Sequence, residues 1–230
     1  MKRAQSGFTL IEIAIVLVII GLLLGGVLKG QQLIDSAKVK NLANDFRNIP
    51  VFIYGYQDKF KALPGDDAAV VAHLGATATP ATTPSGKQGN GVIDGYWNSI
   101  TATDESVLFW QHVRLAGLAP GETTVNVAVG NTYIPTNSAG GNIGIQSGTT
   151  VATSSPILDA SSNAIRGAYV ICSAGILGKF VKQLDTTMDD GNTATGSMMA
   201  TLTTGYVIGA PATPTASIDE AATYTVCMGI

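Results

Sequence analysis

A long apolar run near the N-terminus constrains this chain more than any other feature. Residues 8–28 are apolar apart from a single charged side chain, Glu12. As an α-helix this run would be about 30 Å long at roughly 1.5 Å per residue, which is enough to cross the hydrocarbon core of a bilayer. Lys2 and Arg3 precede it and favour a cytoplasmic N-terminus. The sequence therefore predicts a single-pass anchor with the rest of the chain outside the cytoplasm.

The run fits a conventional cleaved signal peptide poorly. It is longer than the roughly 7–15 residues of a usual signal-peptide core, and no Ala-x-Ala-like site follows it promptly. Glu12 also needs an explanation, because a charge near the bilayer centre costs about 2.5–3.5 kcal/mol on insertion scales. One explanation is a carboxylate that reaches the headgroups near the start of a plain anchor.

The start of the run offers a second explanation. Residues 6–12, Ser-Gly-Phe-Thr-Leu-Ile-Glu, follow a short basic leader and resemble the class III leader junction of type IV pilins and type II secretion pseudopilins. The resemblance implies that residues 1–7 are a leader, that a prepilin peptidase cuts after Gly7, and that the new N-terminal Phe8 is N-methylated. It also implies an inner-membrane assembly platform and a helical filament of this chain with other pilin-like subunits. The final location would be a pilus at the cell surface or a pseudopilus.

Within this resemblance, Glu12 takes the acidic position that is characteristic of the family. Cleavage frees an amino group at Phe8, which is positive below its usual pKa of about 7.7–8.0. We expect the Glu12 carboxylate of one subunit to pair with the Phe8 ammonium of a neighbour, since such a pair offsets the desolvation of both charges and fixes axial register. Before assembly, Glu12 is expected to be an unpaired charge in lipid, which favours the filament.

The sequence differs from many pilins at one position, and it does not distinguish a pilus subunit from a secretion pseudopilus subunit. Lys29 stands where many family members carry proline, and glycines 21, 25, 26 and 30 surround it. Their spacing lets helices approach closely, although each glycine lowers helix propensity by about 1 kcal/mol relative to alanine. A pilus or pseudopilus subunit, a minor priming or tip subunit, and a monomeric anchored adhesin or binding domain all stay open.

The rest of the chain predicts an α+β fold, with the long N-terminal helix packed on an antiparallel β-sheet head. We expect a transmembrane or assembly helix over residues 8–30, an amphipathic helix over 31–62 with a kink near 46–49 before Pro50, and a globular head over 63–230. A short helix should follow Asp104 as N-cap and close at Gly117 or Gly121. Strands are expected where β-branched residues lie between turn formers, at residues 123–129, 131–135, 142–146, 164–174, 205–210 and 223–230.

The two cysteines, Cys172 and Cys227, predict one disulfide, since a pair in an exported chain is usually oxidised. Two unrelated buried thiols are the alternative. The bridge would join the last strand covalently to an interior strand. The resemblance implies the same feature, since type IV pilins typically have a C-terminal region bounded by a disulfide.

Nothing in the sequence favours an enzyme or a nucleic-acid binder. The net charge is −3 without a long basic run, and no Gly-x-Ser-x-Gly, His-Glu-x-x-His or P-loop motif occurs. The two histidines, His73 and His112, are far apart in sequence, and His112 is expected to be a packed helix residue.

One acidic segment is a metal candidate, and no other cofactor is expected. Asp185, Asp189, Asp190 and Asn192 offer oxygen ligands suited to calcium, although their spacing does not follow the calcium-loop pattern D-x-[DN]-x-[DN]-G. An ordinary turn with side-chain-to-backbone hydrogen bonds is the alternative.

Overall fold

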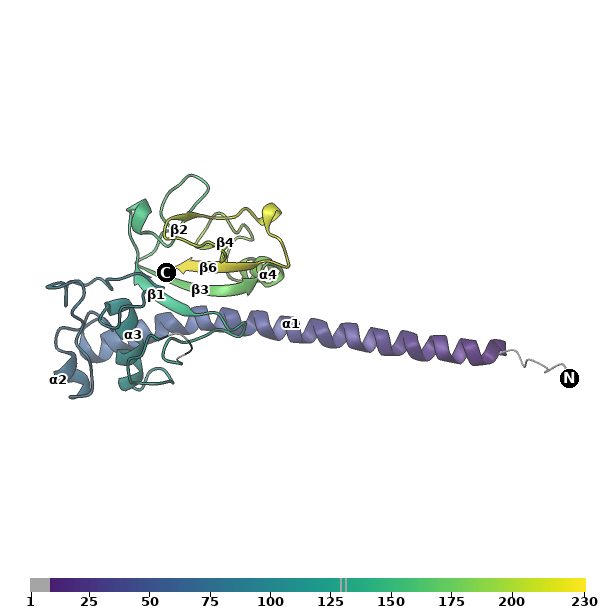
Figure 1. Ribbon diagram of the computed structural model, residues 1–230, viewed down its shortest axis with the longest axis horizontal. Coiled ribbons are helices and arrows are strands. Elements are labelled where there is room, and N and C mark those ends of the chain that lie inside the picture. The colour runs from purple at the N-terminus through teal and green to yellow at the C-terminus, as the bar shows by residue number, and fades with distance from the viewer. Residues whose placement is uncertain (1–8, 129, 131) are drawn as a thin grey trace. The chain divides into compact units, whose positions relative to one another are not determined.

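The computed structural model describes residues 9–128, 130 and 132–230. The chain divides into two compact units, Met1–Lys38 and Val39–Ile230. A single helix, α1 (Leu10–Phe60), begins in the first unit and ends in the second, and Figure 1 labels it with the other elements. The prediction of one continuous helix from the apolar run into the amphipathic segment is therefore confirmed, and Pro50 lies inside the helix rather than at its end.

From Leu10 to Leu28, within the first unit, α1 is apolar apart from Glu12 and is exposed all round. Leu10, Leu22 and Leu28 are among its exposed side chains, and none of the most apolar stretch is buried. By length and composition this part of α1 can cross a membrane. A helix that is apolar on every side is stable only where lipid or other helices surround it.

In the second unit, α1 buries one stripe. The buried residues recur at steps of three and four, as predicted, and are Val39, Leu42, Ala43, Phe46, Ile49, Ile53 and Tyr56. All of them except Tyr56 form one core cluster with residues of α3 (Glu105–Leu115) and with Ile145, Ile171 and Val226 of the sheet. The stripe therefore provides one wall of the head core.

The head contains a four-stranded antiparallel sheet, in agreement with the predicted α+β fold. Its strand order is β1 (Ile143–Ser147), β3 (Tyr169–Leu177), β6 (Thr223–Gly229) and β4 (Met198–Leu202). Figure 1 shows β3 and β6 between the two outer strands. Each face of the sheet packs in a different core cluster. Ile171 belongs to the cluster of α1, whereas its neighbours Val170 and Cys172 belong to a second cluster, which also contains Cys227 and Trp97. This is the alternation expected of neighbouring residues in a strand.

The remaining elements are short. They are α2 (Val70–Leu74), the 3₁₀ turns η1 (Ala152–Ser154) and η2 (Thr215–Ser217), the parallel pair β2 (Ile157–Leu158) and β5 (Ala210–Pro211), and α4 (Gly178–Met188). Figure 1 shows α4 beside one end of β6.

Several sequence expectations for the head are wrong. Residues 123–128 form no strand, because Val125 and Val127 pack on the core from a segment that has no partner strand. Residues 205–210 contribute only Ala210 to a strand. Helix α4 and strand β4 were not predicted. Strand β4, Met-Met-Ala-Thr-Leu, has a single β-branched residue, so its composition gives little strand signal.

The predicted helix after Asp104 is confirmed, but its cap is not. Asp104 occupies the N-cap position without a side-chain bond to the helix backbone. Its carboxylate instead accepts a hydrogen bond from Ser99 Oγ at 2.6 Å. At the other end, Gly117 follows the C-cap with φ of 76°, a conformation that favours glycine.

Replacing a residue of the α1 stripe should destabilise the head. Phe46 is 1% exposed, so Phe46→Ala should lower the free energy of unfolding by about 3–5 kcal/mol through lost burial and a residual cavity. Val51→Ala, at a position that is 64% exposed on the same helix, is the matched control and should have little effect. Urea unfolding of the detergent-solubilised chain, followed by near-ultraviolet circular dichroism, measures both. Equal effects would mean that the stripe does not form the core wall.

Candidate functional site

The start of α1 carries a capping box. Thr9 N and Thr9 Oγ1 donate hydrogen bonds to Glu12 Oε2 at 2.8 and 2.7 Å, and Glu12 N donates to Thr9 Oγ1 at 3.3 Å. This reciprocal arrangement satisfies backbone donors that a helix N-terminus otherwise leaves open. Glu12 therefore has hydrogen-bond partners in its own chain, but they are neutral, so the expectation of an unpaired charge before assembly stays a prediction. The signal, Thr-x-x-Glu before an apolar run, was present in the sequence.

The capping box uses only one oxygen of the Glu12 carboxylate. Both contacts from Thr9 are to Oε2, and a carboxylate has roughly four lone-pair positions. Among the described residues, no bond to Oε1 is found. The proposed cleavage junction, Gly7 and Phe8, lies outside the described residues.

The glycines of α1 leave its backbone accessible. At Gly21, Gly25, Gly26 and Gly30, an added Cβ would have no atom within 4 Å. Nothing in the described chain occupies this space. Small residues at four-residue spacing are typical of surfaces where two helices approach closely.

The Cys172–Cys227 disulfide is present, as predicted. The two residues face each other in the β3–β6 ladder, with Cα atoms 4.1 Å apart, and both are fully buried. The bridge joins the two central strands and encloses α4, β4 and β5. On a chain-entropy model, closing a loop of this length stabilises the fold by roughly 4 kcal/mol.

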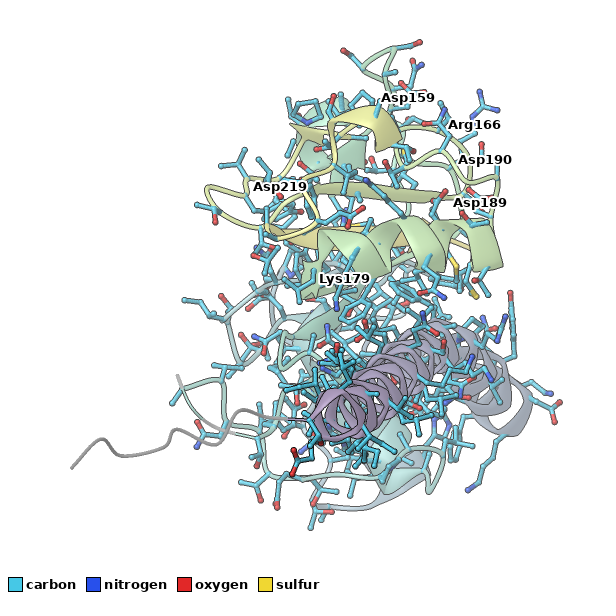
Figure 2. The ribbon with its side chains drawn as sticks, turned by 90° about the vertical axis from the view of Figure 1, so that its right-hand side faces the viewer. Asp159, Arg166, Lys179, Asp189, Asp190 and Asp219 are labelled. Carbon is cyan, nitrogen blue, oxygen red and sulfur yellow. A yellow bond between two sulfur atoms is a disulfide. The ribbon has the colours of Figure 1, made fainter. Side chains whose placement is uncertain are left out.

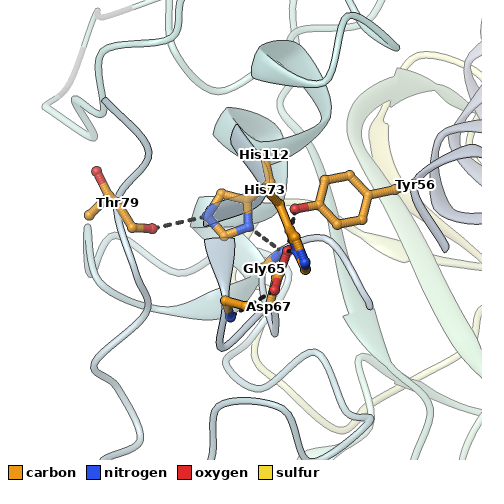
Figure 3. Close-up of polar contacts among 7 residues, drawn as sticks. Tyr56, Gly65, Asp67, His73, Thr79 and His112 are labelled. Atoms are coloured by element: carbon orange, nitrogen blue, oxygen red, sulfur yellow. Dashed lines mark hydrogen bonds and ion pairs between the residues drawn. The ribbon is translucent and has the colours of Figure 1, made fainter. Parts of the chain in front are cut away.

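His112 is a buried structural histidine. The backbone N–H of Gly65 donates to His112 Nδ1 at 2.9 Å, so Nε2 carries the proton and donates to the carbonyl of Thr79 at 2.9 Å (Figure 3). Burial lowers the pKa of His112, which favours this neutral form. Both ring nitrogens are occupied, so the packed-helix interpretation is confirmed and His112 offers no ligand atom to a metal.

His73 belongs to a different contact. Asp67 Oδ2 accepts a hydrogen bond from Tyr56 Oη at 2.7 Å and lies 2.7 Å from His73 Nδ1 (Figure 3). Burial raises the pKa of Asp67, but hydrogen bonds from His73 and Tyr56 outweigh it, and the net pKa is lowered. The contact ties the end of α1 to α2. Sequence reasoning did not find it, because the three residues lie on separate elements.

A second aspartate organises the neighbouring loop. Asp66 accepts hydrogen bonds from the backbone of Gly89 and Asn90 through Oδ1, at 2.5 and 3.2 Å, and from Gly91 through Oδ2, at 2.7 Å. Glu105 is fully buried beside it and accepts from Asp94 N at 2.8 Å. Burial raises the pKa of Glu105 to about 7, with smaller contributions from nearby aspartates. These carboxylates fix the loop geometry.

Three of the four residues of the predicted metal candidate lie close together: Asp185 in the last turn of α4, and Asp189 and Asp190 directly after it. Ligand oxygens of Asp185, Asp189 and Asp190 all lie within 4.8 Å of one another. Burial, with smaller contributions from the neighbouring Asp190 and Asp189, raises the pKa of Asp185 to about 7, against a hydrogen bond from the backbone of Gly191. Asn192 is used within the turn, because its Oδ1 accepts from Ala194 N at 3.3 Å and its N–H donates to Asp190.

Comparison with known proteins identifies the N-terminal segment. Residues 2–28 match the family model for the prokaryotic N-terminal methylation motif. The chain carries the type IV pilin and pseudopilin signature. This signature points to a structural subunit rather than an enzyme, and with the apolar helix it fits membrane anchoring. No curated protein and no solved structure matches the chain significantly.

The Asp67 contact predicts a pH-dependent contribution to stability. Because the folded-state pKa lies below the unfolded value of about 3.9, the contribution is present above that value and is lost as pH falls through the folded pKa. Asp67→Asn should lower the midpoint of thermal unfolding at pH 7, and the difference from wild type should shrink below about pH 4. Asp58→Asn, which removes an exposed carboxylate on α1, is the control and should be neutral at both pH values. A difference that does not change with pH would contradict this account.

Proposed function

We propose that this chain is a structural subunit of a type IV pilus or type II secretion pseudopilus. The observation that carries the proposal is the methylation motif over residues 2–28, continuous with a helix that is apolar and exposed all round. A prepilin peptidase would cut after Gly7, Phe8 would be N-methylated, and the inner-membrane assembly platform would add the subunit to a filament. Before assembly the head would lie in the periplasm.

The first unit suits polymerisation through its helix. Exposed leucines and isoleucines lose little when they leave lipid for neighbouring helices, so packing and polar pairing must favour the filament. The open glycine positions allow close approach of backbones. The mechanism is assembly, and it requires no catalytic residue.

Glu12 supplies the polar pairing in this proposal. The capping box holds Oε2 at the helix start and leaves Oε1 for the Phe8 ammonium of a neighbouring subunit. Filament assembly would then add a second partner to a carboxylate that already caps its own helix. In a water-free bundle, loss of one member of such a pair costs about 3–5 kcal/mol.

Processing at Gly7 provides the first test. The peptidase must approach the backbone at this junction, so a branched side chain should block cleavage. Gly7→Val should remain as the uncut precursor, whereas Gly7→Ala should be cleaved better than bulkier variants. Intact-mass spectrometry of the membrane fraction distinguishes the precursor from the methylated chain beginning at Phe8. Normal cleavage of the Val variant, or an intact Met1 in wild type, would remove the pilin proposal and favour a plain anchor.

Charge and capping at Glu12 can be separated. Glu12→Gln keeps an oxygen that can cap the helix but removes the negative charge. It should be cleaved and inserted into the membrane as wild type, yet form no fibres, because the Phe8 ammonium loses its counter-charge. Fibre yield after shearing, normalised to membrane content, measures this.

Thr9→Val is the matched control for the Glu12 variant. It removes the hydroxyl that donates to Glu12 while keeping the carboxylate and the size of residue 9. We expect fibres from Thr9→Val. If instead Glu12→Gln forms fibres and Thr9→Val does not, the glutamate acts only as a helix cap, and the pairing between subunits would be refuted.

A further inference from the structure

A small cavity lies between α1 and α3 in the second unit. Its volume is about 190 Å³, and its walls come from both helices, the loop after α3 and the start of β1. Ile49, Trp110 and Ile143 are buried wall residues, and Phe52 is partly buried against the same core. An apolar cavity of about 150 Å³ is large enough for a benzene ring. The cavity can therefore hold one ring with a short substituent.

One residue of the wall carries a charge that the chain does not balance. Asp45 lies one helical turn before Ile49 on α1, and its side chain is partly buried. Burial raises the pKa of Asp45 to about 6, and neither a hydrogen bond nor a charged group contributes to this shift. Among the described residues, the carboxylate of Asp45 thus has no counter-charge. A partly desolvated carboxylate in this state is costly, so a cation beside it would be bound favourably.

Arg114 is the other charged residue of the wall, but it is already held by the chain. Its Nε donates to the carbonyl of Pro120 at 3.2 Å, and its Nη1 donates to the carbonyls of Glu122 and Tyr133 at 2.8 and 2.7 Å. Its guanidinium carbon also lies 5.2 Å from the centre of the Tyr133 ring. These contacts fix Arg114 as a wall residue, and it does not act as the counter-charge of Asp45.

Other basic side chains of the described chain do not line the cavity. Figure 2 shows Lys179 on α4 and Arg166 on the loop before β3, and neither is a wall residue. Lys182 pairs with Glu220 outside the cavity. A cation that pairs with Asp45 must therefore come from another molecule.

We propose that this cavity binds a small organic ammonium ion, with the apolar body of the ligand against Phe52 and Trp110 and its charge at Asp45. Aromatic rings bury apolar surface and also attract cations through their faces. Asp45 is more exposed than Ile49 and Trp110, so the charged end of the ligand can keep part of its hydration. The site uses only residues after Val39, so it does not depend on the pilin proposal.

The chemistry of the wall disfavours two other kinds of ligand. A metal ion needs several oxygen or nitrogen ligands, and Asp45 is the single carboxylate of the wall. An anion could approach Arg114, but in so small a cavity it would also lie near the carboxylate of Asp45, which repels it. The net preference should therefore be for a cation.

Three probes with the same ring and different charges test the proposal. The full chain in detergent is titrated at pH 7.5 with benzylamine, benzyl alcohol and benzoate, and tryptophan fluorescence is followed because Trp110 lines the cavity. Titrations of detergent alone correct for partition into micelles. We expect saturable binding of benzylamine, at least tenfold tighter than that of benzyl alcohol, and still weaker binding of benzoate.

Two variants separate the charge of Asp45 from the shape of the cavity. Asp45→Asn keeps the shape and should lower the affinity for benzylamine at least tenfold, to that for benzyl alcohol. Asp58→Asn removes an exposed carboxylate from the same helix and changes the net charge equally, so it should bind benzylamine as wild type. Near-ultraviolet circular dichroism checks that both variants are folded.

A change of pH repeats the test without a mutation. At pH 5 most of the Asp45 carboxyl is neutral, so the affinity of wild type for benzylamine should fall severalfold from its value at pH 7.5. Arg114 and benzylamine stay protonated at both pH values, and Asp45→Asn should show no such change. If Asp45→Asn does not fold, the wild-type pH dependence decides. Binding of benzoate as tight as that of benzylamine, unchanged affinity in folded Asp45→Asn, equal affinity at both pH values, or no saturable binding of benzylamine would overturn the proposal.

Discussion

The burial of one stripe of α1 determines how the rest of the head is arranged. From Val39 onward the apolar residues of the helix recur on one side, and one face of the sheet is packed in the same cluster. The opposite face of the sheet then needs its own cover, which Trp97 and the segments around β2 and β5 provide. From Leu10 to Leu28 the same helix has no buried stripe, because it is apolar on every side and exposed. The two parts of α1 therefore suit different surroundings. Only the part from Val39 onward packs against other residues of the chain.

The central pair of strands carries the topology of the sheet. Strands β3 and β6 form its middle, and β6 is also the last strand of the chain. The Cys172–Cys227 bridge joins these two strands covalently at a cross-strand pair of the ladder. It also confines α4, β4 and β5 to one closed loop, so that the acidic cluster after α4 is held against β4 from both ends.

The parts of the fold that sequence predicted are those with a regular physical pattern. The α1 stripe, the helix after Asp104 and strands β3 and β6 have clear periodicity or β-branched composition, and two cysteines allow one intramolecular pairing. Strand β4 was missed because it contains one β-branched residue. Helix α4 has a helical repeat in Phe180, Val181, Leu184 and Met188 that could have predicted it. The contact of Tyr56, Asp67 and His73 is a tertiary feature that no local pattern encodes. The Thr9–Glu12 capping box is different, because its Thr-x-x-Glu spacing is a local signal that the sequence carries.

The carboxylates of this chain differ chiefly in how many hydrogen bonds they accept from the chain itself. Asp66 receives three backbone N–H groups, and Asp67 receives a phenol and an imidazole. These two carboxylates need no partner from another molecule, and their hydrogen bonds stabilise the fold directly. Glu12, by contrast, is hydrogen-bonded through only one of its two oxygens.

A carboxylate that remains incompletely paired in a site poor in water is costly unless another molecule completes it. In the pilin proposal, the Phe8 ammonium of a neighbouring subunit completes the Glu12 carboxylate in this way. A neighbour would then be bound where the isolated subunit leaves a charge without a counter-charge.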